Sequence, residues 1–213
     1  MLEGKYIDDA IRGPYEEWPI YGPCLYVSFG VARDLSDESH SLAFLPKEPL
    51  AVAGDEHTRL HVNHYSYDPT LAPPGKSSVI VHIPETSYEY WSELYKDPER
   101  YKAEKQRLAD AVIARLDERF PGIKEQVEVV DVATPMTYVR YTGNWRGSYM
   151  GWLDAPETAG KTMKRTLPGL GSFYMAGQWI YPGAGIPGAI MSGRHLIQII
   201  CKKDKKEFAA TTP

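Results

Sequence analysis

The sequence predicts an α+β fold with a mixed, largely antiparallel sheet and one long helix that covers a face of that sheet. Two patterns support this: short segments rich in β-branched and aromatic residues, and one long segment with apolar residues at helical spacing. The chain has 213 residues, 43% hydrophobic and 24% charged, which allows a substantial core. This composition argues against disorder, a collagen-like chain and a coiled coil.

The predicted strands alternate partly with period two and are bounded by Gly, Pro, Asp and Ser clusters. They are expected near residues 24–33, 59–67, 77–83 and 126–133. Between the first two, Pro46 and Pro49 remove ladder donors, so two short edge pieces joined by a turn are expected there. Residues 68–77 concentrate turn residues and are expected to link two strands as a hairpin connection or longer loop.

The long helix is expected over residues 97–120. Asp97 supplies an N-cap oxygen and Pro98 a first-turn proline, and the pattern stops at Pro121 and Gly122. Its charged face is interpreted as solvated. The apolar stripe expected to face the sheet consists of Tyr101, Leu108, Ala109, Val112, Ile113, Leu116 and Phe120.

Residues 138–152 follow the strand predicted at 126–133, which Thr134 and Pro135 are expected to end. They hold three glycines, two tryptophans, three tyrosines and two arginines without a steady period. This composition fits a loop that lines a ligand site. It fits an aromatic packing corner equally well, and composition alone leaves both interpretations open.

The net charge of −4 is unevenly distributed. Beyond residue 160, eight Lys or Arg stand against Asp204 and Glu207, a net of +6, so residues 1–160 carry −10. A basic end suits an anionic cofactor or a membrane surface. A short lysine-rich tail is also typical of a solvated helix end.

The two cysteines, Cys24 and Cys201, are too few for a disulfide framework or a four-ligand zinc site, which predicts a reducing, cytoplasmic setting. No apolar run approaches the roughly 20 residues of a spanning helix. The first 20 residues lack a basic start followed by an apolar stretch. We therefore expect neither a transmembrane segment nor a signal peptide.

Two further groups of polar residues are candidate sites. His61 and His64 lie three apart on a predicted strand and should face opposite sides, so no metal site is expected. Ser192 and His195 lack the G-x-S-x-G elbow of a serine nucleophile. Ser192 is expected to be a helix-packing hydroxyl, and no catalytic residue is identified.

Near the C-terminus, residues 173–180 indicate a strand, 182–188 a tight turn and 189–203 a helix. Gly183, Gly185 and Gly188 match G-x-G-x-x-G. A dinucleotide fingerprint also needs a parallel strand and an acidic residue after the helix, for which the remaining sequence is too short. A helix start near Pro187 would still present free N–H groups to an electron-rich oxygen, unless the turn only packs.

Residues 167–208 (LPGLGSFYMAGQWIYPGAGIPGAIMSGRHLIQIICKKDKKEF) resemble the C-terminal end of the phytoene desaturase-like FAD-dependent oxidoreductases. This family includes carotenoid desaturases, carotenoid isomerases and retinol saturases, within the wider amine-oxidase-like flavoprotein group. Residues 134–152 support the resemblance. It implies carotenoid or retinoid metabolism, with FAD acting on an apolar polyene or lipid-like substrate by desaturation, saturation or isomerisation.

The resemblance also implies a set of cofactor-binding residues: Gly177, Gln178, Gly185, Pro187, Gly188 and Ala189. The first two would lie near the ribityl chain and pyrophosphate, and the last three beside the isoalloxazine carbonyl. Related flavoproteins often have an acidic residue where this chain has Gln178. The Gln178 amide can still donate and accept hydrogen bonds.

Full-length family members begin with a βαβ unit whose G-x-G-x-x-G holds the FAD pyrophosphate, and the first half of this chain has no such motif. The resemblance therefore implies a C-terminal half, inactive alone, that is either a truncated product or the partner of a separate N-terminal FAD-binding polypeptide. Residues 1–160 are expected to form part of the substrate-binding domain, and residues 161–213 to contact FAD.

The isolated chain is expected to self-associate and not to bind nucleic acid, with peripheral membrane contact left open. The alternative function is a non-catalytic module that binds an apolar ligand or a partner protein.

Overall fold

The computed structural model describes residues 3–84, 86–183 and 185–210. The chain divides into two compact units. Residues 22–149 form the first, called here the sheet unit. Residues 1–21 and 150–213 together form the second, called here the terminal unit.

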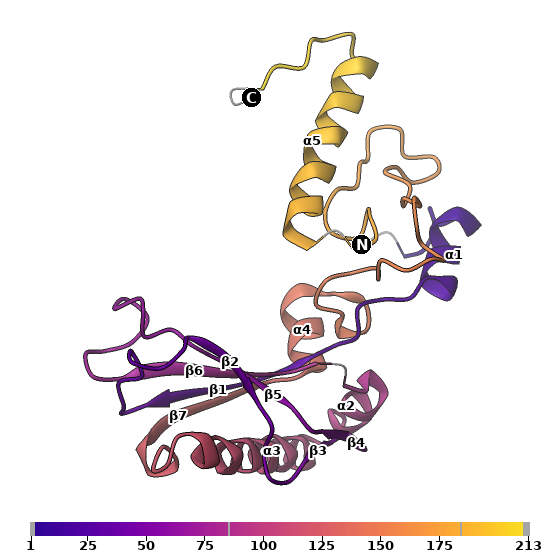
Figure 1. The fold of residues 1–213 in the computed structure, drawn as a ribbon. Helices are drawn as coiled ribbons and strands as arrows, with labels where there is room; N and C mark the ends of the chain where they lie inside the picture. The colour runs from indigo at the N-terminus through magenta and orange to yellow at the C-terminus, as the bar shows by residue number, and fades with distance from the viewer. Residues whose placement is uncertain (1–2, 85, 184, 211–213) are drawn as a thin grey trace. The chain divides into compact units, whose positions relative to one another are not determined.

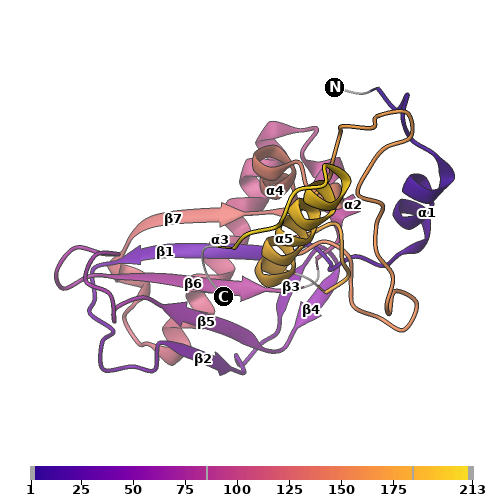
Figure 2. The ribbon, with the colours of Figure 1, turned by 90° about the horizontal axis from the view of Figure 1, so that it is seen from above.

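The sheet unit is built on five antiparallel strands in the order β2, β5, β6, β1, β7 (Figure 2). The four predicted strand regions are confirmed, and so is the antiparallel character of the sheet. The bounds are β1 Leu25–Val31, β2 Ser41–Phe44, β5 Leu60–His64, β6 Ser77–Ile83 and β7 Val127–Ala133.

Helix α3 (Pro98–Arg119) lies along one face of this sheet (Figure 1). Strands β1 and β6 alternate strictly between buried and half-buried residues, which directs Val27 and Val81 into the core beneath α3. The opposite face of the sheet is called here the outer face. The predicted helical stripe is confirmed, because the core includes Leu108, Ala109, Val112, Ile113, Leu116 and Phe120, with Tyr101 packed against it.

The two short pieces expected around Pro46 and Pro49 are β2 and β3 (Leu50–Val52), but they belong to different sheets. Strand β2 is an edge of the large sheet, whereas β3 pairs with β4 (Asp55–His57). The β3–β4 turn places Ala53 at φ 52° and Gly54 at φ 95°. Two consecutive positive φ angles are typical of a tight hairpin.

Short helices complete the sheet unit: α2 (Tyr88–Leu94), η1 (Lys124–Gln126), α4 (Pro135–Thr142) and η2 (Trp145–Gly147). Of the two interpretations of residues 138–152, the ligand-lining loop does not describe the first residues, because residues 138–142 belong to helix α4. Thr134 ends β7 as predicted, but it also caps α4 in a reciprocal arrangement with Thr137, and Pro135 occupies the first turn.

The terminal unit contains α1 (Asp9–Glu17) and α5 (Gly185–Lys203), and its small core includes Trp152, Met163 and Ile180. The strand predicted at residues 173–180 is wrong. These residues are irregular or in turns. Their backbone bonds to residues 163 and 165 do not form a ladder: Met175 N donates to Arg165 O at 2.7 Å, and Met163 N donates to Ile180 O at 2.9 Å. Strand-like composition alone does not make a strand without an adjacent partner strand.

The tight turn predicted over residues 182–188 is also shorter than expected, because α5 already begins at Gly185. Pro187 therefore lies inside the first turn of the helix. A proline is tolerated there, since its missing N–H would have had no partner within the helix.

Candidate functional site

The predicted cofactor-binding residues lie in two adjacent pieces of the terminal unit. The first piece is a turn at residues 177–180, and the second is the beginning of α5. We call residues 177–189 the glycine turn. Within it, Gly177 and Gln178 lie in the turn at residues 177–180. The beginning of α5 holds Gly185, Pro187, Gly188 and Ala189.

Ser192 joins these two pieces. The backbone N–H of Gly177 donates to Ser192 Oγ at 2.7 Å, and the same hydroxyl donates to the carbonyl oxygen of Ala189 at 2.7 Å. Ser192 is fully buried. The expectation of a packing hydroxyl is thus confirmed, and its hydrogen bonds bring two of the predicted residues, Gly177 and Ala189, together.

The glycines of this region are constrained in different ways. Gly177 has φ +124°, and a Cβ added to it would meet no atom within 4 Å. Gly183 has φ +66°, and its Cβ would lie 2.8 Å from Asp154 Cβ. Close packing therefore requires glycine at position 183. At position 177 the backbone conformation favours glycine, and there is free space beside Gly177.

A polar cluster beside the glycine turn has no counterpart in the predictions. Tyr181 Oη lies 2.8 Å from His195 Nδ1, and Arg165 donates to the same Tyr181 oxygen. Arg165 also donates to the carbonyl oxygen of Ser192 at 3.1 Å, and its guanidinium lies over the Tyr181 ring. The three side chains are distant in sequence and follow no known spacing, so only the fold reveals the cluster.

Aromatic side chains form the packing core of the terminal unit. Trp152 is fully buried, contacts the rings of Tyr15, Trp18 and Trp179, and donates from Nε1 to the carbonyl oxygen of Trp179 at 2.9 Å. Of the two interpretations of residues 138–152, the packing corner therefore describes Trp152.

The outer face of the sheet carries a second group of polar side chains. Tyr26 and His82 are cross-strand partners whose rings stack with centroids 5.0 Å apart. Burial, and to a smaller extent the charge of neighbouring His61, lowers the pKa of His82. The imidazole of His82 is therefore neutral at physiological pH.

Immediately before β1 begins, the buried thiol of Cys24 lies 3.5 Å from Tyr138 Oη. Burial raises the pKa of both groups. The thiol and the phenol therefore remain protonated at neutral pH, and Cys24 is not a thiolate nucleophile.

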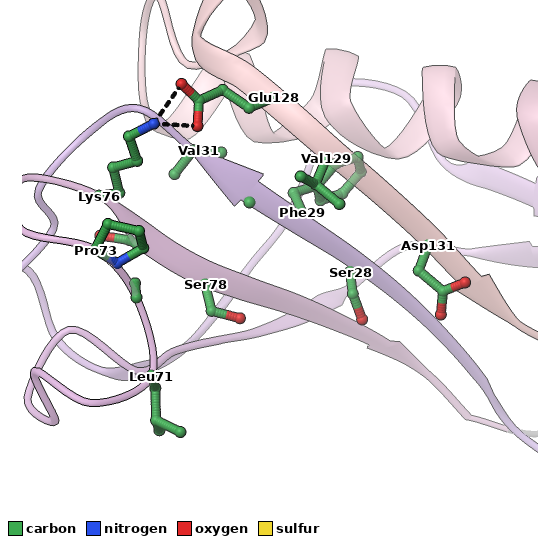
Figure 3. Close-up of a pocket in the computed structure, with 13 residues that line it drawn as sticks. Ser28, Phe29, Val31, Leu71, Pro73, Lys76, Ser78, Glu128, Val129 and Asp131 are labelled. Carbon is green, nitrogen blue, oxygen red and sulfur yellow. Dashed lines mark hydrogen bonds and ion pairs between the residues drawn. The ribbon is translucent and has the colours of Figure 1, made fainter.

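A pocket of about 350 Å³ opens on the same outer face, under the loop between β5 and β6 (Figure 3). One end is bounded by an ion pair in which Lys76 Nζ lies 2.6 Å from Glu128 Oε2. Apolar atoms dominate the lining. Its residues include Leu71, Pro73 and Val129, together with Ser28, Ser78 and Asp131.

His61 and His64 face opposite sides of β5, as predicted: His61 is exposed and His64 is buried. His64 Nε2 contacts the carbonyl oxygen of Glu38 and its Nδ1 contacts Ser66 Oγ, both at 3.2 Å. In the part of the chain that the structure describes, no three His, Cys, Asp or Glu residues are grouped to hold a metal ion.

Within the same described ranges, none of the helices combines the length and hydropathy that crossing a bilayer requires.

No family model matches the chain. Among curated proteins, prolycopene isomerase 2 of an Oncidium hybrid cultivar is 33% identical over 129 residues, 59% of this chain and 21% of that protein. A lycopene-forming phytoene desaturase of Paracoccus sp. is 27% identical over 143 residues, 62% of this chain and 26% of that protein. The all-trans-retinol 13,14-reductase of Danio rerio is 33% identical over 84 residues, 37% of this chain and 14% of that protein.

The chain thus spans between 14% and 26% of the length of these three relatives. These relatives confirm the resemblance read from the sequence: over the matched residues, the chain is similar to prolycopene isomerases, phytoene desaturases and a retinol 13,14-reductase.

Proposed function

We propose that the chain is part of an FAD-dependent oxidoreductase that desaturates, saturates or isomerises an apolar polyene. The relatives support this proposal, since their names give phytoene, prolycopene and all-trans-retinol as substrates. All three are long polyenes, although the reactions differ. We further propose that residues 161–213 contact the flavin and that residues 1–160 contribute to substrate binding.

The glycine turn has the features that a flavin contact needs. Helix α5 has 19 residues, and a helix of this length presents free N–H groups and a positive dipole end at its start. Space beside Gly177 would allow a ligand to approach the backbone. The described residues therefore fit a flavin whose electron-rich atoms lie against this helix start.

Asp154 adds a carboxylate next to Gly183. A carboxylate suits the hydroxyls of a ribityl or ribose group and repels a pyrophosphate. The amide of Gln178 can bind either group. Bound FAD would supply the redox chemistry, and the chain's own part would be to hold the isoalloxazine beside α5 and to keep Gly177 in place through Ser192.

We propose that a second segment completes the FAD site. The glycines at 183, 185 and 188 are preceded by irregular backbone at 173–176 and a turn at 177–180, so the strand that a dinucleotide fingerprint needs is absent from this described stretch. A pyrophosphate left without its own glycine loop loses several charge-assisted hydrogen bonds. Each is worth about 1.5–3 kcal/mol, so FAD affinity should fall by several orders of magnitude.

Exposed apolar side chains on α5 and in residues 173–180 support contact with such a segment. Ile186 is 78% exposed, Ile190 68% and Phe173 38%, whereas Trp179 is half-buried. Exposed large apolar side chains of this kind promote association. We propose that an FAD-binding polypeptide covers it, and that the chain self-associates when that polypeptide is missing, which light scattering would detect.

The pocket on the outer face of the sheet is the proposed place for part of the polyene. Its lining is mainly apolar, and it lies beside half-buried strand residues. Ligand pockets of this kind combine an apolar lining with a few placed polar groups.

The test of the proposed function is the visible absorbance of the purified chain, alone and co-expressed with a polypeptide that carries the glycine-loop FAD-binding unit. We expect flavin absorbance only in the co-expressed sample, together with turnover of a polyene. A complex without flavin, or one that binds polyene without converting it, would support a non-catalytic binding module instead.

A further inference from the structure

His82 carries a buried polar atom on the outer face of the sheet. Its Nε2 is shielded from solvent and has no hydrogen-bond partner among the residues that the structure describes. The ring itself is held in place by stacking on Tyr26. Buried polar atoms are nearly always hydrogen-bonded, so an unpaired one on the same face of the sheet as the pocket indicates a partner that binds along that face.

The position of His82 relates it to the pocket. Ser78, Ile80 and His82 lie on the same side of β6, because strand residues two apart share a face. Ser78 lines the pocket, and His82 lies four residues further along the strand, about 13 Å away. A chain of retinoid length that began in the pocket and followed β6 would reach His82 with its end.

The chemistry of His82 limits what that end can be. Burial and the neighbouring His61 keep the imidazole neutral, so one ring nitrogen donates and the other accepts. A hydroxyl can pair with either form of Nε2, and a carbonyl can pair with an Nε2–H. A hydrocarbon end would leave the nitrogen unpaired, and a carboxylate would favour the charged imidazolium that this environment disfavours.

We propose that the ligand of the outer face is an apolar chain with a terminal hydroxyl or carbonyl oxygen, which hydrogen-bonds to His82 Nε2 while the chain runs along Ile80 toward Leu71 and Val129 in the pocket. This inference rests on the proposed function and narrows its substrate class from polyenes in general to oxygenated ones. The hydrogen bond between His82 Nε2 and the terminal oxygen would make the site prefer an oxygenated chain over a hydrocarbon of the same length.

The experiment compares two ligands with the full chain. All-trans-retinol and the hydrocarbon with a methyl group in place of its CH₂OH are titrated in the same detergent, and quenching of tryptophan fluorescence gives each dissociation constant. We expect retinol to bind about tenfold more tightly, as one hydrogen bond to a buried group provides. His82→Phe keeps a flat ring against Tyr26 and should abolish that difference by weakening retinol alone.

Three further variants make the test specific. His82→Gln keeps a neutral donor and acceptor and should retain most of the preference. His61→Phe removes an exposed imidazole from the same face and should retain most of the preference, because burial is the larger of the two causes that lower the pKa of His82. Leu71→Lys should weaken both ligands to a similar extent, because it places a charge in the pocket that both chains would share.

The outcomes distinguish the proposed role of His82 from the proposed binding of a polyene by the sheet unit. Equal binding of both ligands to the wild type, or the same ratio in wild type and His82→Phe, would overturn the role of His82 and leave polyene binding standing. Unchanged affinities in Leu71→Lys would overturn the path into the pocket. If neither ligand binds the wild type, substrate binding by the sheet unit fails and this inference fails with it.

Discussion

The backbone N–H of Gly177 donates a hydrogen bond to Ser192 Oγ, 2.7 Å away. Gly177 lies in a turn with φ +124°, and Ser192 lies fully buried in α5. The bond therefore fixes a turn that only glycine readily forms against a helix whose start is proposed to contact the flavin. This geometry makes Ser192 a positioning residue for the glycine turn.

Replacing Ser192 should destabilise the fold. Ser192→Ala removes a buried acceptor and leaves the Gly177 N–H unpaired, so the free energy of unfolding should fall by about 1–3 kcal/mol. Urea denaturation measures this. Ser172→Ala is the matched control in the same unit, because Ser172 is exposed, and it should change little. Equal denaturation midpoints for the two variants would contradict the assigned role.

Two glycines near α4 should respond differently to alanine. Both have left-handed φ, +68° at Gly143 and +66° at Gly147. A Cβ at Gly143 would meet nothing within 4 Å, whereas one at Gly147 would lie 2.7 Å from the carbonyl oxygen of Pro135. Gly143→Ala should lose about 1–2 kcal/mol for its φ, and Gly147→Ala about 1–3 kcal/mol more for overpacking. Thermal or urea unfolding that ranks the two equally would refute the close approach.

The β3–β4 hairpin should be open to stabilisation. Ala53 has φ 52°, a conformation that costs a residue with an ordinary Cβ about 1–2 kcal/mol. Asn followed by Gly is the preferred pair for this turn, so Ala53→Asn should raise the free energy of unfolding by about 0.5–1 kcal/mol. Ala51→Asn, at an exposed strand position, is the control and should bring no gain. A loss of stability in Ala53→Asn would argue against the turn.

Stability should depend on pH through His82. Its folded-state pKa is lowered, first by burial and then by His61, so the unfolded chain binds the proton more readily. The contribution of His82 to the free energy of unfolding is therefore fully present above the ordinary pKa of about 6.5. It is lost progressively as the pH falls below that value. His82→Phe should flatten the slope between pH 7.5 and 5.5 in urea titrations. His61→Gln should keep most of it, since burial is unchanged, and an equal slope in wild type and His82→Phe would exclude this residue as the source.

The strands and α3 could be predicted because their signals are local. Alternation in 77–83 and the apolar spacing from Leu108 to Phe120 follow from facing a single core. The short helices α1 and α2 were missed, although each has an N-cap. Asp8 accepts from the N–H of Ile11 at 3.0 Å, and Ser87 from that of Tyr90 at 3.1 Å. Helices of nine and seven residues show too few turns for a periodic signal.

The candidate site was only partly predictable. Motif resemblance indicated the glycine turn, and the structure brings Gly177 and Ala189 together through Ser192. The stacking of Tyr26 on His82 follows from the β1–β6 register, which the sequence does not specify. The strand predicted at residues 173–180 is wrong because their apolar and aromatic side chains pack around Ile180, and their backbone has no partner strand in the described part of the chain.

The most direct test of the central claim, that the glycine turn contacts the flavin, is the ratio of flavin to protein absorbance after gel filtration. The chain is co-expressed with a glycine-loop FAD-binding unit as wild type, Gly188→Val and Gly193→Val. Both glycines lie in α5, so both variants test a helical position, but only Gly188 lies within the glycine turn. Gly188→Val should abolish flavin retention, because a branched side chain would block the approach of the ring to the backbone. Gly193→Val should retain flavin near the wild-type ratio. Equal ratios for all three proteins would contradict the claim, and stoichiometric FAD in the chain alone would contradict the need for a second segment.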